Sequence, residues 1–299
     1  MSDKKSGSFE DEYSHIKAFN EQGYLLAEKL YKAAQSTYQN HFWMPEAMES
    51  PVITDVDLKK SSKIDLILKH EEMNGGPWHY ALVECKRLNP EYVFWAFPYK
   101  NECNGYVKVN SIENQTKNFV SSFTPFSSEW KFENFNTVKK ATWGVSVREK
   151  AQQSRISNTD EIEKAAVQVC TQTYGFIAKE TRALSETVSS EHYSRRYFYP
   201  IIVTSAPLFV MGFNPEEIDD LGSFKLKRER MEVDWLIYEH VIDPWITRDW
   251  GLTRYSTADV RMEKYRSTID ILIVNSAKFL DFLDALTNGI SLRTQKTKN

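Results

Sequence analysis

The sequence predicts an α/β fold in which helices pack on a β-sheet. Apolar residues between about 14 and 38 recur at steps of three and four, as they do on a buried helix. Three short runs of strand-forming residues follow at 52–58, 63–69 and 78–87, with a Gly-Gly-Pro turn before the last. A second helical pattern covers residues 159–185. This alternation favours one sheet with helices against it over an all-helical or all-β fold.

The C-terminal half continues the same alternation. The run at 199–205 is largely apolar, which is typical of a buried strand, and 268–275 is a further strand candidate. A helical pattern at 277–286 closes the series, so we expect a central mixed sheet flanked by helices. Further strand candidates lie at 141–148, 208–213 and 231–240.

Most of the chain is predicted to form one large domain. Its 299 residues include 8 Trp, 15 Tyr and 17 Phe, which provide enough surface to bury a core without disulfides or metals. We expect this domain over residues 13–290, with polar, flexible tails at 1–12 and 291–299. The aromatic-rich and partly loop-like stretch 88–158 is interpreted as an insertion between core elements.

The charge balance excludes one class of binding protein. The chain carries 38 Lys and Arg against 41 Asp and Glu, so its net charge is 38 − 41 = −3. Binding of nucleic acid through overall charge is therefore excluded, whereas a local basic groove is not. No phosphate-binding GxxxxGKS/T motif occurs, so any energy-driven step needs a partner such as an ATPase or sensor subunit.

The cysteine and histidine patterns argue against disulfide and zinc sites. Cys85, Cys103 and Cys170 have no CxxC spacing, and the six histidines show no HxH or HExxH spacing. Sparse cysteines favour a reducing compartment. The chain has no secretory N-terminal pattern and no run of about 18 apolar residues, so we expect a cytoplasmic protein without a membrane span.

Two acidic residues and a lysine on neighbouring strand patterns form the candidate catalytic site. Asp65 lies within the apolar run KIDLILK, and Glu84 and Lys86 flank Cys85 in ALVECKR. Side chains alternate along a strand, so Glu84 and Lys86 share a face, on which Asp65 can lie nearby if the two strands pair. Two neighbouring carboxylates repel each other, so both stay ionised only when a cation is present.

A hard divalent cation satisfies this requirement. Mg²⁺ binds through oxygen ligands and keeps several waters, and Mn²⁺ can take its place. Beside such a cation, Lys86 can orient a metal-bound water, help to deprotonate it, and offset phosphate charge. The simpler interpretations are a solvent-facing Asp65 at a strand edge and a Glu84–Lys86 ion pair that contributes little to stability.

These residues resemble the PD-(D/E)xK nuclease superfamily, which has the restriction-endonuclease-like fold. The matching pieces are KIDLIL with Asp65 and ALVECKRL with Glu84 and Lys86, in the element order αβββαβ. The resemblance covers roughly residues 14–88 and the helix–strand pair at 159–205. It implies that Asp65 and Glu84 hold the metal, that the Cys85 carbonyl adds a ligand, and that Lys86 is the catalytic lysine.

Two further features belong to the same resemblance. Many members carry a glutamate on the first helix, for which Glu28 is the best match and Glu21 the alternative. Some carry a glutamine motif on the helix after ExK, and Gln168 and Gln172 lie one turn apart here. They would contact substrate, unless they form an ordinary polar stripe. Their spacing departs from the QxxxY form of some exonuclease members, because the tyrosine falls at 174.

The sequence leads to the hypothesis of a Mg²⁺-dependent endodeoxyribonuclease that hydrolyses DNA phosphodiester bonds. By resemblance, prokaryotic antiviral defence is the expected setting, because this fold is often used there. Two alternatives stay open: a non-catalytic nucleic-acid-binding or assembly subunit with the same fold, and an RNA-cleaving effector. A homodimer is compatible with the hypothesis, since cutting two strands needs two active sites and the sequence contains one.

Overall fold

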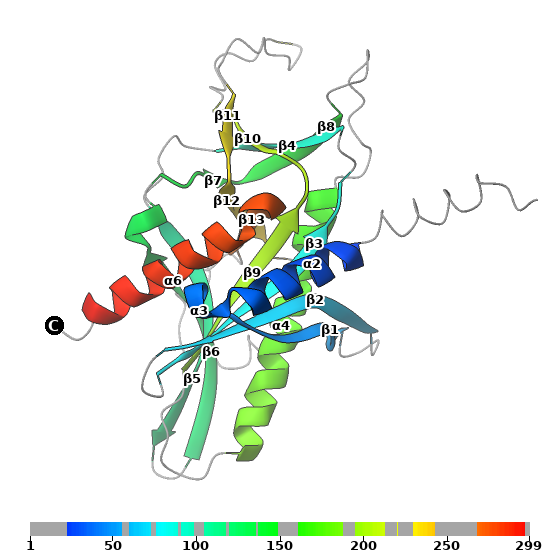
Figure 1. The fold of residues 1–299 in the computed structure, drawn as a ribbon. Helices are drawn as coiled ribbons and strands as arrows, with labels where there is room; N and C mark the ends of the chain where they lie inside the picture. Colours follow the sequence, from blue (N-terminus) through cyan, green and yellow to red (C-terminus); the bar gives the residue numbers. More distant parts are fainter. Residues whose placement is uncertain are drawn as a thin grey trace, which may run out of the picture.

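The structure, a computed structural model, has an α/β fold with a mixed central sheet and helices on both of its faces (Figure 1). Its helices are α2 (Gly23–Ser36), α3 (Tyr38–His41), α4 (Glu161–Thr187) and α6 (Phe279–Lys296). The described residues are 23–55, 60–72, 76–88, 91–98, 105–117, 120–135, 137–148, 161–187, 195–212, 220, 230–242 and 268–296.

The central sheet contains most of the described strands. Its main path is β1 (Met44–Asp55), β2 (Lys60–Glu71), β3 (Trp78–Lys86), β9 (Arg195–Thr204), β13 (Thr268–Asn275), β12 (Trp235–Val241) and β7 (Lys140–Ala141). Off this path, β5 (Tyr106–Lys117) pairs with β9 and with β6 (Val120–Lys131).

Strand β3 is central because it joins the two parts of this sheet. It pairs antiparallel with β2 and parallel with β9, and β9 in turn pairs parallel with β13. Every residue from His79 to Cys85 is buried. A strand with neighbours on both edges and helices over both faces is expected to carry mainly apolar side chains. The single acid in it, Glu84, is therefore an exception that needs an explanation.

Helices cover the two faces of β3 differently. On one face, α2 and α6 enclose a core that includes Val83 and Cys85. On the other face, α4 packs over Tyr80 and Leu82 (Figure 1). Because side chains alternate along the strand, Glu84 points toward α4.

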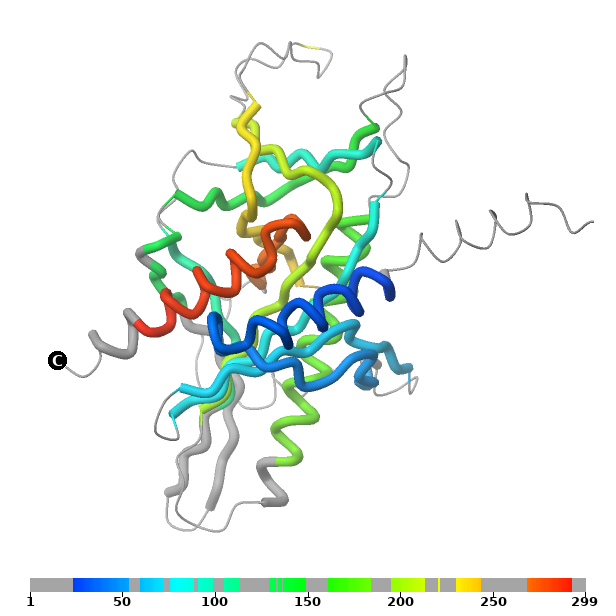
Figure 2. The backbone as a smooth tube through the Cα atoms, in the orientation of Figure 1, coloured from blue at the N-terminus to red at the C-terminus, as the bar shows by residue number. Residues whose placement is uncertain are grey.

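A second, smaller sheet lies beyond the ends of β3 and β9, at the top of the view in Figure 2. Residues 205–207 lead into it from β9: Ser205 N–H donates to the Lys86 carbonyl at 3.2 Å, and the Pro207 carbonyl accepts the N–H of Phe94 at 3.0 Å. Its strand order is β11 (Met231–Val233), β10 (Leu208–Val210), β4 (Tyr92–Phe97) and β8 (Trp143–Arg148).

The predicted strands at 63–69, 78–87, 199–205 and 268–275 are confirmed as β2, β3, β9 and β13, and the predicted second helix is α4. The stretch predicted as an insertion, 88–158, supplies strands to both sheets. The domain boundaries themselves stay a prediction.

Several predicted boundaries differ from the structure. The strand expected at 52–58 begins eight residues earlier, at Met44, because the whole of β1 pairs with β2. The run expected as one strand at 231–240 is broken at Asp234, so that β11 joins the second sheet and β12 the central one. The first helix is described from Gly23 and ends at Ser36; residues 14–22 of the prediction lie outside the described part.

The last helix also runs longer than its pattern predicts, to Lys296 instead of Leu286. Gly289, which normally disfavours a helix interior, lies within it. A Cβ at this position would lie 2.2 Å from Cδ1 of Phe132, so tertiary packing requires a glycine here. The apolar pattern, which stops at Leu286, therefore predicts too early an end for this helix.

Gly175 makes a similar close approach possible between α4 and β1. A Cβ at residue 175 would lie 2.4 Å from the carbonyl oxygen of Ile53. We expect Gly175→Ala to lower the free energy of unfolding by about 1–2 kcal/mol, since the overpacking cost exceeds the gain in helix propensity. Urea denaturation measures this. Val167→Ala, at an exposed position of the same helix, serves as the control and should change stability by less than about 0.5 kcal/mol.

Candidate active site

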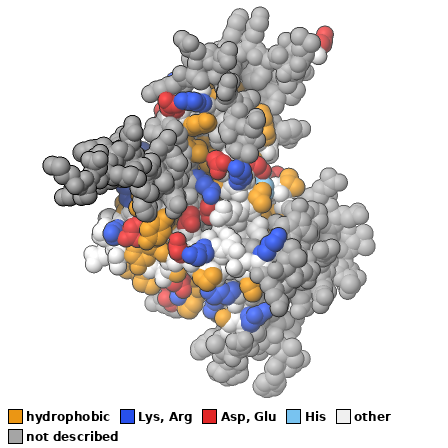
Figure 3. Space-filling view, turned by 90° about the vertical axis from the view of Figure 1, so that its right-hand side faces the viewer, with side chains coloured by type: hydrophobic (Ala, Val, Ile, Leu, Met, Phe, Trp, Pro, Cys, Tyr) orange, Lys and Arg blue, Asp and Glu red, His pale blue; other side chains and the backbone are white. Residues whose placement is uncertain are grey.

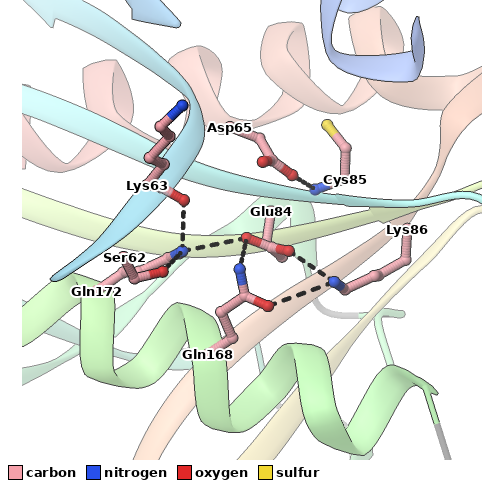
Figure 4. Close-up of polar contacts among 8 residues, drawn as sticks. All are labelled: Ser62, Lys63, Asp65, Glu84, Cys85, Lys86, Gln168 and Gln172. Carbon is pink, nitrogen blue, oxygen red and sulfur yellow. Dashed lines mark hydrogen bonds and ion pairs between the residues drawn. The ribbon is translucent and has the colours of Figure 1, made fainter. Parts of the chain in front are cut away.

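The Glu84 carboxylate is the centre of a buried polar cluster at the end of β3 (Figure 4). Its side chain is 2% exposed. The Lys86 ammonium lies 2.8 Å from Glu84 Oε1, so the two side chains share a face as the alternation along the strand predicts. Lys86 remains partly exposed, which places one end of the ion pair within reach of solvent.

Two glutamines of α4 hold the other carboxylate oxygen. Gln168 Nε2 donates to Glu84 Oε2 at 2.9 Å, and Gln172 Nε2 donates to the same oxygen at 3.3 Å. Gln168 Oε1 also accepts a hydrogen bond from Lys86 Nζ at 3.4 Å. Residues four apart on a helix lie on one face, so both amides reach the strand together. Gln168 and Gln172 are therefore part of the site rather than a solvent-facing polar stripe.

Gln172 extends the cluster to the neighbouring strand. Its Nε2 donates to the Lys63 carbonyl at 2.7 Å and to Ser62 Oγ at 3.0 Å, which connects α4 to β2. Its Oε1 is buried and makes no hydrogen bond within the described structure. A buried oxygen without a donor is uncommon, and it provides a neutral ligand atom beside Glu84.

Asp65 lies on β2 next to this cluster. Its carboxylate accepts a backbone N–H of β3, as a carbonyl oxygen of a paired strand does elsewhere in the sheet. The pairing of β2 with β3 ends at Leu66 and Val83. One residue further, Asp65 Oδ2 accepts the backbone N–H of Cys85 at 2.8 Å. The structure thus brings Asp65 to the strand that carries Glu84 and Lys86, through a backbone contact that side-chain alternation does not predict.

Burial dominates the electrostatics of the two acids. Loss of solvent, and after it the nearby Asp65 charge, raise the pKa of Glu84 to about 7 against the opposing effects of Lys86 and Gln172. Burial also raises the pKa of Asp65, while the Cys85 N–H and the Lys86 charge oppose the shift. Two acids with one lysine leave an excess of negative charge when both are ionised.

The other predicted site residues lie elsewhere. The Cys85 thiol belongs to the core on the α2 side, and burial raises its pKa well above the usual value. The role expected for the Cys85 carbonyl stays a prediction. Glu28 forms an ion pair with Lys32 at 2.9 Å along α2, and none of its described contacts reaches Asp65 or Glu84.

Glu49 is a neighbour of the site that the sequence does not reveal. It lies between the β1 residues paired with Leu66 and Ile64 of β2, and is therefore across from Asp65. Its φ of 47° is in the left-handed region that favours glycine, and its charge contributes to the raised pKa of Asp65. Its carboxylate pairs with Lys63 at 3.0 Å. A glutamate does not by itself indicate a left-handed backbone conformation, because this conformation depends on how β1 pairs with β2.

A metal would have to bind through few protein side chains. Within the described residues, no group of three or more His, Cys, Asp or Glu side chains is placed to hold a metal ion. Mg²⁺ commonly binds through one or two carboxylates and keeps several waters, so Asp65 and Glu84 match its donor requirement. A zinc site built from three or four protein ligands has no such match here.

Comparisons with protein-family models, with curated proteins and with solved structures give no match. No helix in the described part of the chain has the length and hydropathy needed to cross a membrane.

The raised pKa of Glu84 predicts a pH-dependent stability. Its folded value of about 7 exceeds the ordinary 4.5, so ionisation favours unfolding, and stability present below about pH 4.5 is lost as the pH rises to about 7. Without metal, the unfolding free energy of the wild type, relative to Glu84→Gln, should fall by about 2–3 kcal/mol between about pH 5 and about pH 8. Urea denaturation in EDTA measures both proteins. Parallel pH profiles would contradict the assignment.

Proposed function

We propose that this protein is a divalent-metal-dependent nuclease that hydrolyses phosphodiester bonds, with DNA as its substrate class. One observation carries the proposal: a buried carboxylate, Glu84, touches Lys86 and lies beside Asp65 where the pairing of β2 with β3 ends. Ionisable groups with strongly shifted pKa values cluster at functional sites. Catalysis needs groups whose protonation is tuned to the reaction, whereas folding has no such need.

The donor set suits Mg²⁺ or Mn²⁺. Asp65 and Glu84 supply hard oxygen atoms, and the Cys85 carbonyl and the unpartnered Gln172 Oε1 are further oxygens in the same region. A carboxylate whose ionised form is destabilised by burial gains most from a nearby cation. When bound, the cation would lower the pKa of a coordinated water and stabilise charge on the phosphate.

The chain's own residues then have distinct roles. The partly exposed Lys86 presents a positive charge that can orient the attacking water and offset the charge that develops on the phosphate. Gln168 binds both Glu84 and Lys86, so it holds their relative positions. Gln172 fixes Glu84 against β2. In this proposal both glutamines are positioning residues.

The superfamily assignment is part of the same proposal. With α3 and the intervening strands β4–β8 set aside, the order α2, β1, β2, β3, α4, β9 is similar to the αβββαβ order of the restriction-endonuclease-like core, with Asp65 on β2 and the ExK residues on β3. DNA as substrate is an analogy with that superfamily.

Substrate affinity cannot rest on overall charge. The net charge is −3, and on the face in Figure 3 the described Lys and Arg side chains are dispersed among acidic and apolar ones. A local basic groove, another kind of contact, a second copy or a partner must therefore contribute.

One observation favours a non-catalytic binding subunit as the second candidate. Lys86, Gln168 and Gln172 satisfy both oxygens of Glu84 without any metal. A complete polar network of this kind can also serve to fix the packing of α4 on the sheet.

Activity distinguishes the two candidates. Glu84→Gln and Lys86→Ala should each reduce Mg²⁺- or Mn²⁺-dependent cleavage by at least about 100-fold, since each removes charge stabilisation or proton transfer. Plasmid, linear duplex and single-stranded DNA are assayed beside RNA, with EDTA as the blank. Glu161→Gln, whose carboxylate pairs with Lys164 on the surface of α4, is the control and should keep full activity. Equal rates for wild type and Glu84→Gln would contradict the proposal.

Metal binding provides a second test. Mg²⁺ at about 100 times its Kd should stabilise the wild type by about 2.7 kcal/mol, because a ligand that binds only the folded state adds to its stability. Asp65→Asn and Glu84→Gln should lose this effect. Thermal unfolding and calorimetry with Mn²⁺ measure it. Intact folding with no metal affinity would favour the non-catalytic candidate.

A further inference from the structure

Four aromatic side chains form a continuous row across the second sheet, and we refer to Phe209, Trp95, Phe97 and Trp143 as the aromatic row. Phe209 lies opposite Trp95, and Phe97 opposite Trp143, in neighbouring strands. Trp95 and Phe97 are two residues apart on β4 and so share a face. The Trp95–Phe209 rings stack at 5.3 Å and 30°, and the Phe97–Trp143 rings at 4.6 Å and 29°.

The row occupies the face of the second sheet that is turned away from the core. The alternate residues Phe94 and Ala96 of β4, and Leu208 and Val210 of β10, belong to the main core. Trp143 nevertheless stays 56% exposed at the edge strand β8. Phe97 covers one side of its indole, so the exposed area includes a flat aromatic surface that internal packing does not use.

Positive charge accompanies the row at its Phe209 end. The Arg230 guanidinium lies 4.8 Å from the centre of the Phe209 ring, and its side chain is exposed. Stacked rings beside a guanidinium group match a ligand that combines flat π-surfaces with negative charge.

The second sheet is joined directly to the strand ends that carry the candidate active site. Strand β4 begins six residues after Lys86, and β10 begins four residues after Thr204, which pairs with Lys86. The Ser205 hydroxyl joins these two connections, since it accepts from Leu88 N–H at 3.0 Å and donates to the Leu88 carbonyl at 3.1 Å. The sheet that carries the aromatic row is therefore anchored at the end of β3.

Phe97 and Phe209 are buried and support the two tryptophans of the row from within. We propose that Trp143 and Trp95, with Arg230, bind the unpaired bases of a single-stranded nucleic acid by stacking. This inference rests on the proposed function and specifies the form of its substrate. Stacking on aromatic side chains tolerates any base and adds affinity that does not depend on net charge. It therefore supplies the contact that a chain of net charge −3 needs.

Binding of fluorescent oligonucleotides of about 12 nucleotides, within the site sizes known for single-strand binding, tests the proposal. Oligo-dT, oligo-U and a duplex are compared by anisotropy in EDTA, where metal-dependent cleavage cannot occur. We expect either single strand to bind at least about 10-fold more tightly than the duplex, and the tighter of the two identifies DNA or RNA as the source. Trp143→Ala should weaken single-strand binding by about 5- to 150-fold, and Trp143→Phe should retain most of it.

Val241→Ala, at an exposed apolar position of β12, is the matched control and should bind like the wild type. Equal affinity of wild type and Trp143→Ala, or preference for the duplex, would overturn the aromatic-row proposal even if cleavage occurs. Conversely, binding that depends on Trp143 without any metal-dependent cleavage would support the aromatic-row proposal and remove the nuclease proposal. Trp143→Phe preserves the ring, so it separates a loss of stacking from a loss of folding.

Discussion

The burial of the Glu84 carboxylate between β3 and α4 is the constraint on which the arrangement of this region depends. A buried charge is stable only with hydrogen-bond partners or an opposite charge. Lys86 supplies the charge from the same strand, and Gln168 and Gln172 supply amides from α4. These contacts fix the rotation and register of α4 on the sheet. Gln172 then connects the helix to β2. One acid and the two glutamines that bind it thus join α4 to β2 and β3, which lie much earlier in the sequence.

A second buried cluster in the same sheet shows what distinguishes the Glu84 region. Asp270 of β13 has a fully buried side chain that pairs with Lys140 at 2.8 Å and accepts the Lys108 N–H at 2.8 Å, while Glu239 pairs with both lysines. Two acids there face two lysines, so the charges balance. At Glu84, two acids share one lysine, and ionisation leaves negative charge without a partner. This difference in charge, rather than burial, makes the Glu84 region suited to a cation.

Alternation along β3 was enough to predict that Glu84 and Lys86 lie together, because side-chain direction along a strand is a local property. Spacing on α4 likewise predicted that Gln168 and Gln172 share a face, and the structure turns that face to Glu84. The contact of Asp65 with the Cys85 amide was not predictable, because it depends on where the pairing of β2 and β3 ends. Glu28 does not join this cluster, because its helix packs on the opposite face of β3 from Glu84.

The sequence by itself determined the longer helices and the strands β2, β3, β9 and β13, which side chains of β3 share a face, and that affinity cannot rest on net charge. These properties depend on residues a few positions apart or on composition. Only the tertiary structure decided that β3 pairs with β9, more than a hundred residues later, and that the second sheet lies beside Lys86. It also decided that Glu49 adopts a left-handed conformation across from Asp65. Such non-local pairings are selected by the packing of whole faces against one another, which no short window of sequence contains.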